Sequence, residues 1–127
     1  MNALDGFTTF NFDEGLPYVS LTSHGITFNK AVTMKLGYPE RAILLINSST
    51  HQIALQRCSD ETENSMPFYN AQKKSKVLSV RWNSKDLLNT LSDLMGWDLT
   101  IHSFRVAGKL LKAENAMVFN LDEATQS

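Results

Sequence analysis

The sequence lacks the features on which most exported or membrane proteins depend. Cys58 is the single cysteine among 127 residues, so no disulfide can form within the chain. No apolar run approaches the length of a membrane-spanning helix, and the N-terminal segment is acidic, unlike a signal peptide. These absences predict a soluble cytoplasmic protein and exclude a fold that depends on disulfides.

The patterns of a metal centre and of an active site are missing as well. His24, His51 and His102 have no second ligand type three or four residues away, and there is no cysteine pair. The six glycines occur singly, so none forms a phosphate-binding loop. Residues 48–50 lie at a predicted hairpin tip, not in the strand-to-helix turn that presents a catalytic serine. We therefore expect no enzymatic activity, no metal and no cofactor.

Positive and negative charges are nearly balanced in the sequence. Twelve Lys and Arg against thirteen Asp and Glu give a net charge of −1, which argues against a protein that coats nucleic acid. The charges are nevertheless grouped along the chain. Residues 72–85 carry five cations and no acid, whereas residues 59–65 (SDETENS) are acidic and polar. We interpret the acidic segment as a solvated loop between two halves of one domain.

The first half, residues 26–58, has the pattern of a strand, a short helix and a hairpin. Asn29 occupies the N-cap position, because its side-chain oxygen can accept from a free helical N–H group. Gly37 supplies the left-handed residue that ends the helix, and Pro39 prevents its continuation. The hairpin arms are predicted at residues 42–47 and 52–57.

The second half, residues 77–121, repeats this order. An alternating strand ends at Trp82, and either Asn83 or Ser84 caps a helix that Gly96 closes. Two further strands, IHSFRVAG and AMVFNL, follow this helix. The sequence therefore predicts an α+β fold, a small mixed barrel-like sheet built from two pseudo-repeated β-α-β-β units with two short helices. The predicted single domain spans 1–127, with an N-terminal arm and strand at 1–25, units at 26–58 and 77–121, a connecting loop at 59–76 and a tail at 122–127.

Both units are expected to contribute to one core. The predicted members are Phe28, Leu36, Ile43, Leu45, Val80, Trp82, Leu88, Leu91, Met95, Phe104, Val106 and Phe119. The N-terminal arm is rich in aromatic residues, namely Phe7, Phe10, Phe12 and Tyr18. These rings either cover the barrel or, if exposed, dock a partner, and we favour the covering role.

The segment FNKAVTMKLG resembles the strand-to-helix segment of AbrB-type swapped-hairpin proteins, the transition-state regulators and antitoxins. The residues that match that pattern are Lys30, Val32, Lys35, Leu36 and Gly37. The resemblance implies that both halves of an interleaved DNA-binding barrel lie in one chain, as a pseudo-dimer. Asn29 replaces the proline of the pattern, and residues 38–40 replace its usual Gly-Asp connection. Thr33 stands where those DNA binders often carry an arginine, which removes a charge-assisted phosphate or base contact.

Two functions from different classes follow from these observations. The first is a DNA-binding module similar to a transcriptional regulator, as the resemblance implies. Because the chain also resembles small proteins of bacterial phages and mobile elements in general character, the alternative is an effector that binds and inhibits a host protein. A CRISPR nuclease is one such target. The partner is thus DNA or a host protein complex, with no membrane and no evident small-molecule substrate, and the chain acts as a monomeric pseudo-dimer or a homodimer.

Seven cations are the candidate binding residues for either partner. They are Lys30, Lys35, Lys73, Lys74, Lys76, Arg81 and Lys85. If Arg81 faces outward from an alternating strand, it joins Lys76 and Lys85 on one rim that can position phosphates. The alternative role of these lysines is to protect an edge strand from pairing with other chains, and we favour that role slightly.

Overall fold

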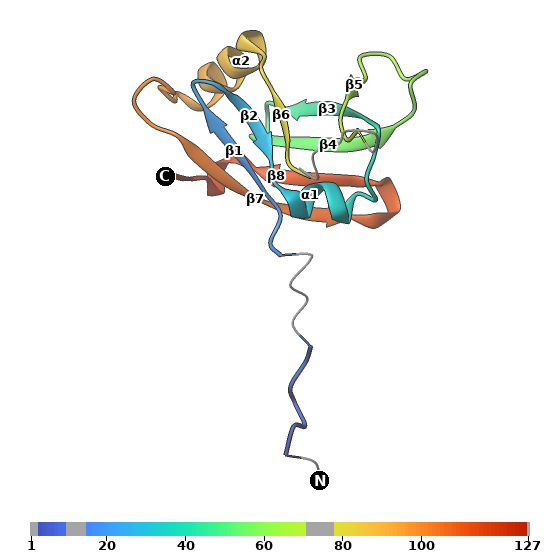
Figure 1. Cartoon of the computed structure of the whole chain (residues 1–127). Coiled ribbons are helices and arrows are strands. Elements are labelled where there is room, and N and C mark those ends of the chain that lie inside the picture. Colours follow the sequence, from blue (N-terminus) through green and yellow to red (C-terminus); the bar gives the residue numbers. More distant parts are fainter. Residues whose placement is uncertain (1–2, 10–14, 71–77, 127) are drawn as a thin grey trace.

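One curled antiparallel sheet holds the protein together in the computed structural model, which describes residues 3–9, 15–70 and 78–126 (Figure 1). The strands of the described residues are β1 (Tyr18–Thr22), β2 (Gly25–Phe28), β3 (Arg41–Asn47), β4 (Gln52–Cys58), β5 (Met66–Pro67), β6 (Val80–Trp82), β7 (Phe104–Leu111), β8 (Ala116–Asn120) and β9 (Thr125–Gln126). The helices are α1 (Lys30–Lys35) and α2 (Lys85–Met95), with short 3-10 turns η1 (Lys112–Glu114) and η2 (Leu121–Glu123). The sheet order is β5-β3-β4-β8-β7-β1-β2-β6, and β9 pairs with β7.

The predicted fold class is confirmed, with one refinement. Every strand pairing among the described residues is antiparallel, so the expected mixed sheet contains no parallel pair there. The reason lies in the connections. Each helix joins two strands that are not neighbours in the sheet, β2 to β3 and β6 to β7, and therefore makes no parallel crossover between neighbours.

The pairing between the two units has the symmetry of the expected repeat. Strand β2 pairs with β6, and Thr27 lies opposite Arg81 at the centre of that pairing. Aligning Phe28 with Trp82 makes Ile26 equivalent to Val80. Exchanging equivalent residues turns the pair Ile26–Trp82 into the pair Phe28–Val80, and both pairs are present. Strand β4 also pairs with β8, the strand in the same place of the second hairpin, so exchanging the two units preserves both pairings between them.

Strand β5 extends this repeat, although it lies within the predicted connecting loop at 59–76. Strand β1 precedes β2 and pairs with β7, and β5 precedes β6 and pairs with β3, the equivalent of β7. The two sides differ in closure, because β1 also pairs with β2 whereas β5 and β6 are the two ends of the sheet. The indole Nε1 of Trp82 donates to the Pro67 carbonyl at 3.0 Å across this open seam. Strand β9 was likewise missed, because it lies in the predicted tail.

The predicted helix ends are confirmed. The Asn29 side-chain oxygen accepts from Val32 N at 3.3 Å and from Tyr18 N at 3.0 Å, so the residue caps α1 and also fixes β1. Ser84, one of the two expected caps, accepts from Leu87 N at 3.2 Å and begins α2. Gly96 ends α2 with a left-handed φ of 69°. A proline at position 29 would lack both side-chain functions.

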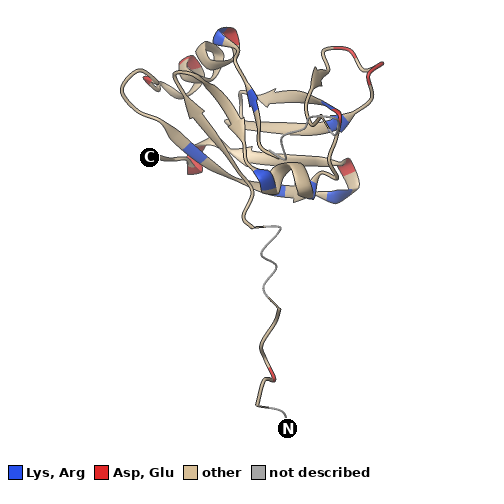
Figure 2. Ribbon diagram, viewed as in Figure 1, with Lys and Arg blue, Asp and Glu red and all other residues tan. Residues whose placement is uncertain are grey.

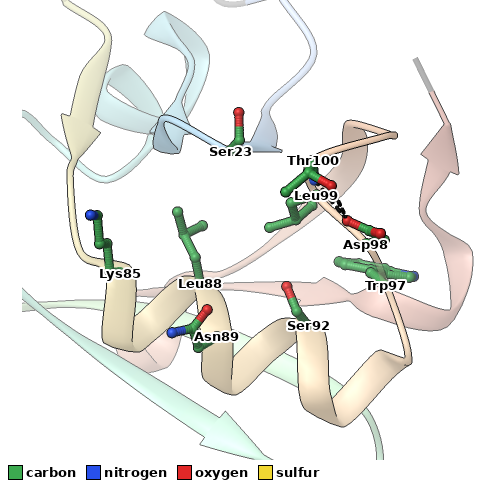
Figure 3. Close-up of a pocket in the computed structure, with 9 residues that line it drawn as sticks. All are labelled: Ser23, Lys85, Leu88, Asn89, Ser92, Trp97, Asp98, Leu99 and Thr100. Carbon is green, nitrogen blue, oxygen red and sulfur yellow. Dashed lines mark hydrogen bonds between the residues drawn. The ribbon is translucent and has the colours of Figure 1, made fainter.

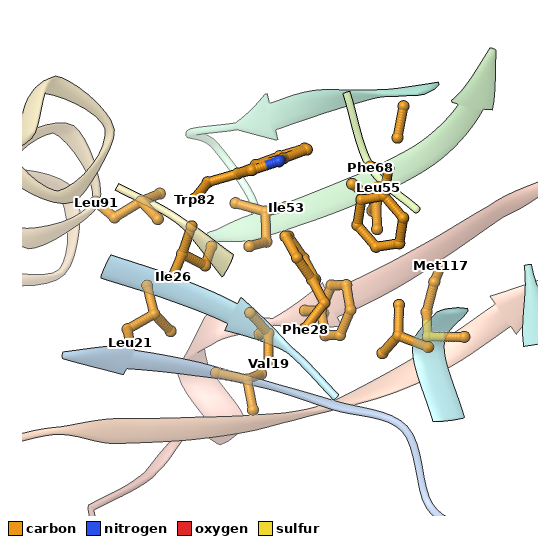
Figure 4. Close-up of a cluster of buried hydrophobic side chains, with 14 of the residues drawn as sticks. Val19, Leu21, Ile26, Phe28, Ile53, Leu55, Phe68, Trp82, Leu91 and Met117 are labelled. Atoms are coloured by element: carbon orange, nitrogen blue, oxygen red, sulfur yellow. The ribbon is translucent and has the colours of Figure 1, made fainter. Parts of the chain in front are cut away.

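The core lies inside the curl of the sheet and draws on both units (Figure 4). Phe28 is fully buried, and its ring centroid lies 5.2 Å from Trp82, 5.5 Å from Phe68 and 6.0 Å from Phe119. Seven of the expected core residues are buried: Phe28, Leu36, Trp82, Leu88, Leu91, Val106 and Phe119.

Five expected core residues are not fully buried, and Leu45 is the clearest error. Its side chain is 45% exposed, because β3 turns Ala42 inward and leaves Ile43 and Leu45 on the outer face. Residues 42–46 are all apolar, so the alternation that identifies the inward face of a strand is absent there. The other four, which are half-buried, are Ile43, Val80, Met95 and Phe104.

The N-terminal arm does not cover the barrel in the residues that the structure describes. Phe7 is 76% exposed and Leu4 is 67% exposed, and the arm extends away from the sheet (Figure 1). Tyr18 belongs to β1 and is half-buried. Phe10 and Phe12 lie outside the described residues. The covering role that we favoured is therefore wrong for Phe7.

Replacement of Leu91 by Ala tests the position of α2. Because Leu91 is fully buried, its truncation should lower the free energy of unfolding by about 2 to 5 kcal/mol in a urea titration. Leu45→Ala is the matched control at an exposed leucine, with an expected loss of about 0.5 kcal/mol or less. Equal losses in the two variants would contradict the assignment of the inner and outer faces.

Candidate nucleic-acid interface

The strands of the described residues carry positive charges and no negative ones. Their cations are Arg41, Arg57, Arg81, Arg105 and Lys109. The Asp and Glu residues that the structure describes belong to helices, 3-10 turns and loops (Figure 2). The near-zero net charge therefore conceals a local separation of charge, in which the sheet itself is basic.

Two of these arginines have structural roles. Arg41 donates from Nε to the Ser65 hydroxyl at 2.8 Å and from Nη2 to the Ser65 carbonyl at 2.9 Å. Arg57 donates from Nη1 to the carbonyls of Leu36 and Gly37, both at 3.4 Å, at the end of α1. Both guanidinium groups thus stabilise loop and helix ends.

Arg81 and Arg105 instead lie on the outer face of the sheet, in one row of paired residues. Arg81 lies opposite Thr27, Thr27 opposite Ser20, and Ser20 opposite Arg105. We call these four residues the arginine row. Their neighbours along each strand, such as Val19, Phe28, Trp82 and Val106, are buried, so the row projects outward. Three strand spacings separate the two arginine backbones, a distance of about 14 Å.

Local contacts position both guanidinium groups over this face. The Arg105 guanidinium carbon lies 4.0 Å from the centroid of the Tyr18 ring, in a cation–π contact. A Cβ atom added to Gly25 would lie 3.3 Å from Arg81 Nε and 2.7 Å from the Trp82 carbonyl oxygen. Arg81 therefore lies against the start of β2, and a side chain at position 25 would crowd it. The four residues of the row offer guanidinium and hydroxyl donors, which is the chemistry of a phosphate contact.

A cavity of about 470 Å³ opens beside the start of β2, and we call it the α2 pocket (Figure 3). Lys85, Asn89 and Ser92 line it from one face of α2, at helical spacings of four and three residues. Ser23, in the turn between β1 and β2, lies across from the helix (Figure 3). The remaining lining residues are Leu88, Trp97, Asp98, Leu99 and Thr100.

The α2 pocket has opposite charges at its two ends, with Lys85 at one and Asp98 at the other (Figure 3). Asp98 Oδ1 accepts from the Thr100 hydroxyl at 2.5 Å and from Thr100 N at 3.0 Å. These two hydrogen bonds, that from the side chain above all, lower the pKa of Asp98 and keep it ionised. Trp97 stacks on Phe104 with 4.1 Å between ring centroids, which fixes its ring beside Asp98 (Figure 3).

The seven cations predicted from the sequence do not form one site. Arg81 and Lys85 are exposed and flank the β1–β2 turn, Arg81 on the sheet and Lys85 in the α2 pocket. Lys30 and Lys35 lie on α1, at the opposite end of the sheet from α2 (Figure 1). The other three, Lys73, Lys74 and Lys76, lie outside the described residues.

Several site residues were missed. Arg105 has the same sequence signal as Arg81, an arginine between apolar residues in an alternating strand, and that signal could have identified it. The roles of Ser20 and Thr27 depend on strand register, and that of Asp98 on the loop after α2, so no local pattern marks them.

Thr33, at the position of the missing arginine, has a structural role instead. It is fully buried, and its hydroxyl donates to the Leu78 carbonyl at 2.7 Å, which ties α1 to the second unit. The position cannot reach a ligand in this fold. Phosphate contacts, if the protein makes them, must therefore come from other residues.

In the part of the chain that the structure describes, no group of three or more His, Cys, Asp or Glu side chains is arranged to hold a metal. The same residues include no helix long and apolar enough to cross a membrane. His51 Nδ1 lies 2.8 Å from Asp122 Oδ1 in an exposed pair. Comparisons of the chain with protein-family models, curated proteins and solved structures give no match.

Replacing Thr100 by Val tests the cause of the Asp98 shift. The variant loses the hydroxyl donor but keeps the backbone donor, so the pKa of Asp98 should rise toward its ordinary value without reaching it. Carboxyl chemical shifts followed by NMR as pH falls would measure the change. An unchanged Asp98 titration would show that the Thr100 hydroxyl contributes nothing.

Proposed function

We propose that the protein is a non-enzymatic nucleic-acid-binding module, similar to a DNA-binding transcriptional regulator, that contacts phosphates through the arginine row. One observation carries the proposal: two outward arginines and two hydroxyl residues align across four strands that contain no acid. The AbrB-type resemblance, with both halves of the barrel in one chain, and a cytoplasmic location belong to the same proposal.

The charge distribution supports phosphate binding at this face in particular. A protein with a net charge of −1 attracts DNA only where its cations are concentrated. Arg41 and Arg57 are engaged by carbonyl and hydroxyl groups. Of the remaining strand cations, Arg81 and Arg105 lie in the row, and exposed Lys109 lies further along β7, outside it. Lys85, at the start of α2, is an exposed cation beside the row. Three phosphate contacts would give only a modest dependence of binding on salt.

Salt dependence provides the quantitative test. Binding to a mixed-sequence DNA duplex, followed by fluorescence anisotropy, should weaken with a log–log slope of roughly −3 if these three cations engage phosphates. Arg81→Ala and Arg105→Ala should each reduce the slope by about 0.9 and weaken all sequences alike. Lys112→Ala removes an exposed cation outside the row and should leave both slope and affinity nearly unchanged.

A single-stranded oligonucleotide of the same length should be measured alongside the duplex. Absence of binding to both at low salt, where surface electrostatics is strongest, would remove nucleic acid as the partner.

A second candidate function is an effector that binds and inhibits a host protein, such as a CRISPR nuclease. The observation that favours it is the outer face of β3, β4 and β8. There Ile43, Leu45, Ala54 and Val118 point outward, and the amides of Gln52 and Gln56 provide the polar groups. A groove of about 200 Å³ runs beside Leu45 and Val118. Lys109 of β7 lies opposite Val118 and borders this surface. A mainly aliphatic surface of this kind suits a protein partner better than a phosphate backbone.

The test of the second candidate is DNA cleavage by a panel of purified CRISPR nucleases with and without the protein. If the outer face docks a nuclease, wild-type protein should inhibit at least one of them, and Leu45→Lys should abolish inhibition because it buries an unpaired charge. Arg105→Ala should inhibit as the wild type does. Unimpaired inhibition by Leu45→Lys would reject this face as the docking surface.

A further inference from the structure

The α2 pocket lies beside the Arg81 end of the arginine row, where the backbone of a strand bound along the row would continue. Arg81 lies against Gly25, the first residue of β2, and Ser23, in the turn just before it, lines the pocket. Lys85 stands at the pocket end nearest the start of α2 (Figure 3). A strand held by Arg105 and Arg81 therefore reaches a third cation at the entrance of a cavity.

The interior of the pocket matches a nucleobase more closely than a phosphate. Leu88, Leu99 and Trp97 supply apolar surface for the flat faces of a base. Asp98 lies at the far end and, being ionised, is an acceptor only, with Oδ1 held by Thr100. Its carboxylate repels phosphate and carbonyl oxygens, and it attracts an N–H group.

The base must be unpaired to make these contacts. In a duplex, the Watson–Crick edge that carries the amino group is already hydrogen-bonded to the opposite base, and both faces are stacked. A pocket that takes the faces and the donor edge of one base thus requires a single strand, a loop or a base turned out of the helix.

We propose that the α2 pocket receives one unpaired base of the bound strand and prefers bases with an exocyclic amino group. Lys85 contacts the neighbouring phosphate, the apolar residues contact the faces of the base, and Asp98 accepts from the amino group. The inference rests on the proposed nucleic-acid binding and adds to it a form, single-stranded. It also adds a preference for cytosine over uracil, because uracil has at C4 a carbonyl oxygen, which the Asp98 carboxylate repels, in place of the amino group. Carboxylates also accept from the cytosine amino group in the major groove of a duplex. The α2 pocket differs because it takes the faces of the base as well, and these are stacked in a duplex.

The test compares two oligonucleotides of twelve nucleotides, one of deoxycytidine and one of deoxyuridine, which differ in base only at C4 and at the N3 proton. Anisotropy titrations of the full chain should give about tenfold tighter binding of the cytidine oligomer, the effect of one charge-assisted hydrogen bond. Asp98→Ala should make the two affinities equal. Asp93→Ala, which removes the same charge from an exposed position on α2 outside the pocket, should raise both affinities slightly and keep their ratio.

The outcomes separate this inference from the proposed function. Equal binding of both oligomers by the wild type, or an equal ratio in Asp98→Ala and Asp93→Ala, overturns the pocket assignment while phosphate binding stands. No binding of either oligomer or of duplex DNA at low salt overturns both. Free dCMP should compete weakly, because it lacks the neighbouring phosphates that the arginine row holds. If free dCMP competes as strongly, per nucleotide, as the oligomer does, the pocket does not lie beside the phosphates held by the arginine row.

Discussion

The ring of Phe28 is the contact on which the arrangement of the two halves depends. It is fully buried and meets Trp82 and Phe119 of the second half as well as Phe68 of the connection between them. These aromatic contacts bring β2 against β6, and that pairing sets Thr27 opposite Arg81. The arginine row on the outer face of the sheet is thus positioned by the apolar cluster on the inner face.

The fold could be predicted where local chemistry determines it. Asn29, Ser84 and Gly96 mark helix ends because a cap needs a particular side-chain oxygen or a left-handed residue, and the structure has them in those roles. The inner face of β3 could not be predicted, because its apolar residues do not alternate. Strand β5 contains a proline and only two residues, and it exists because β3 has a free edge beside it.

The candidate site was less accessible to prediction than the fold. Arg81 could be assigned to the outer face, because it alternates with two inward residues in a short strand. Its alignment with Thr27, Ser20 and Arg105 depends on three strand registers, which arise from tertiary pairing. The α2 pocket likewise combines a helix face, a turn and a loop that are distant in sequence, and only folding brings them together.

The presence of two equivalent units in one chain has a consequence for the symmetry of the outer surface. In a dimer of identical chains, the two residues at the centre of a symmetric pairing are the same, and both ends of the surface are alike. Here the central pair is Thr27 and Arg81, so the symmetry of the backbone is broken by the side chains. An elongated ligand lying across this sheet meets a tyrosine-backed arginine at one end and a pocket at the other. Because the two ends of this surface differ, it can distinguish the two polarities of a chain-like molecule.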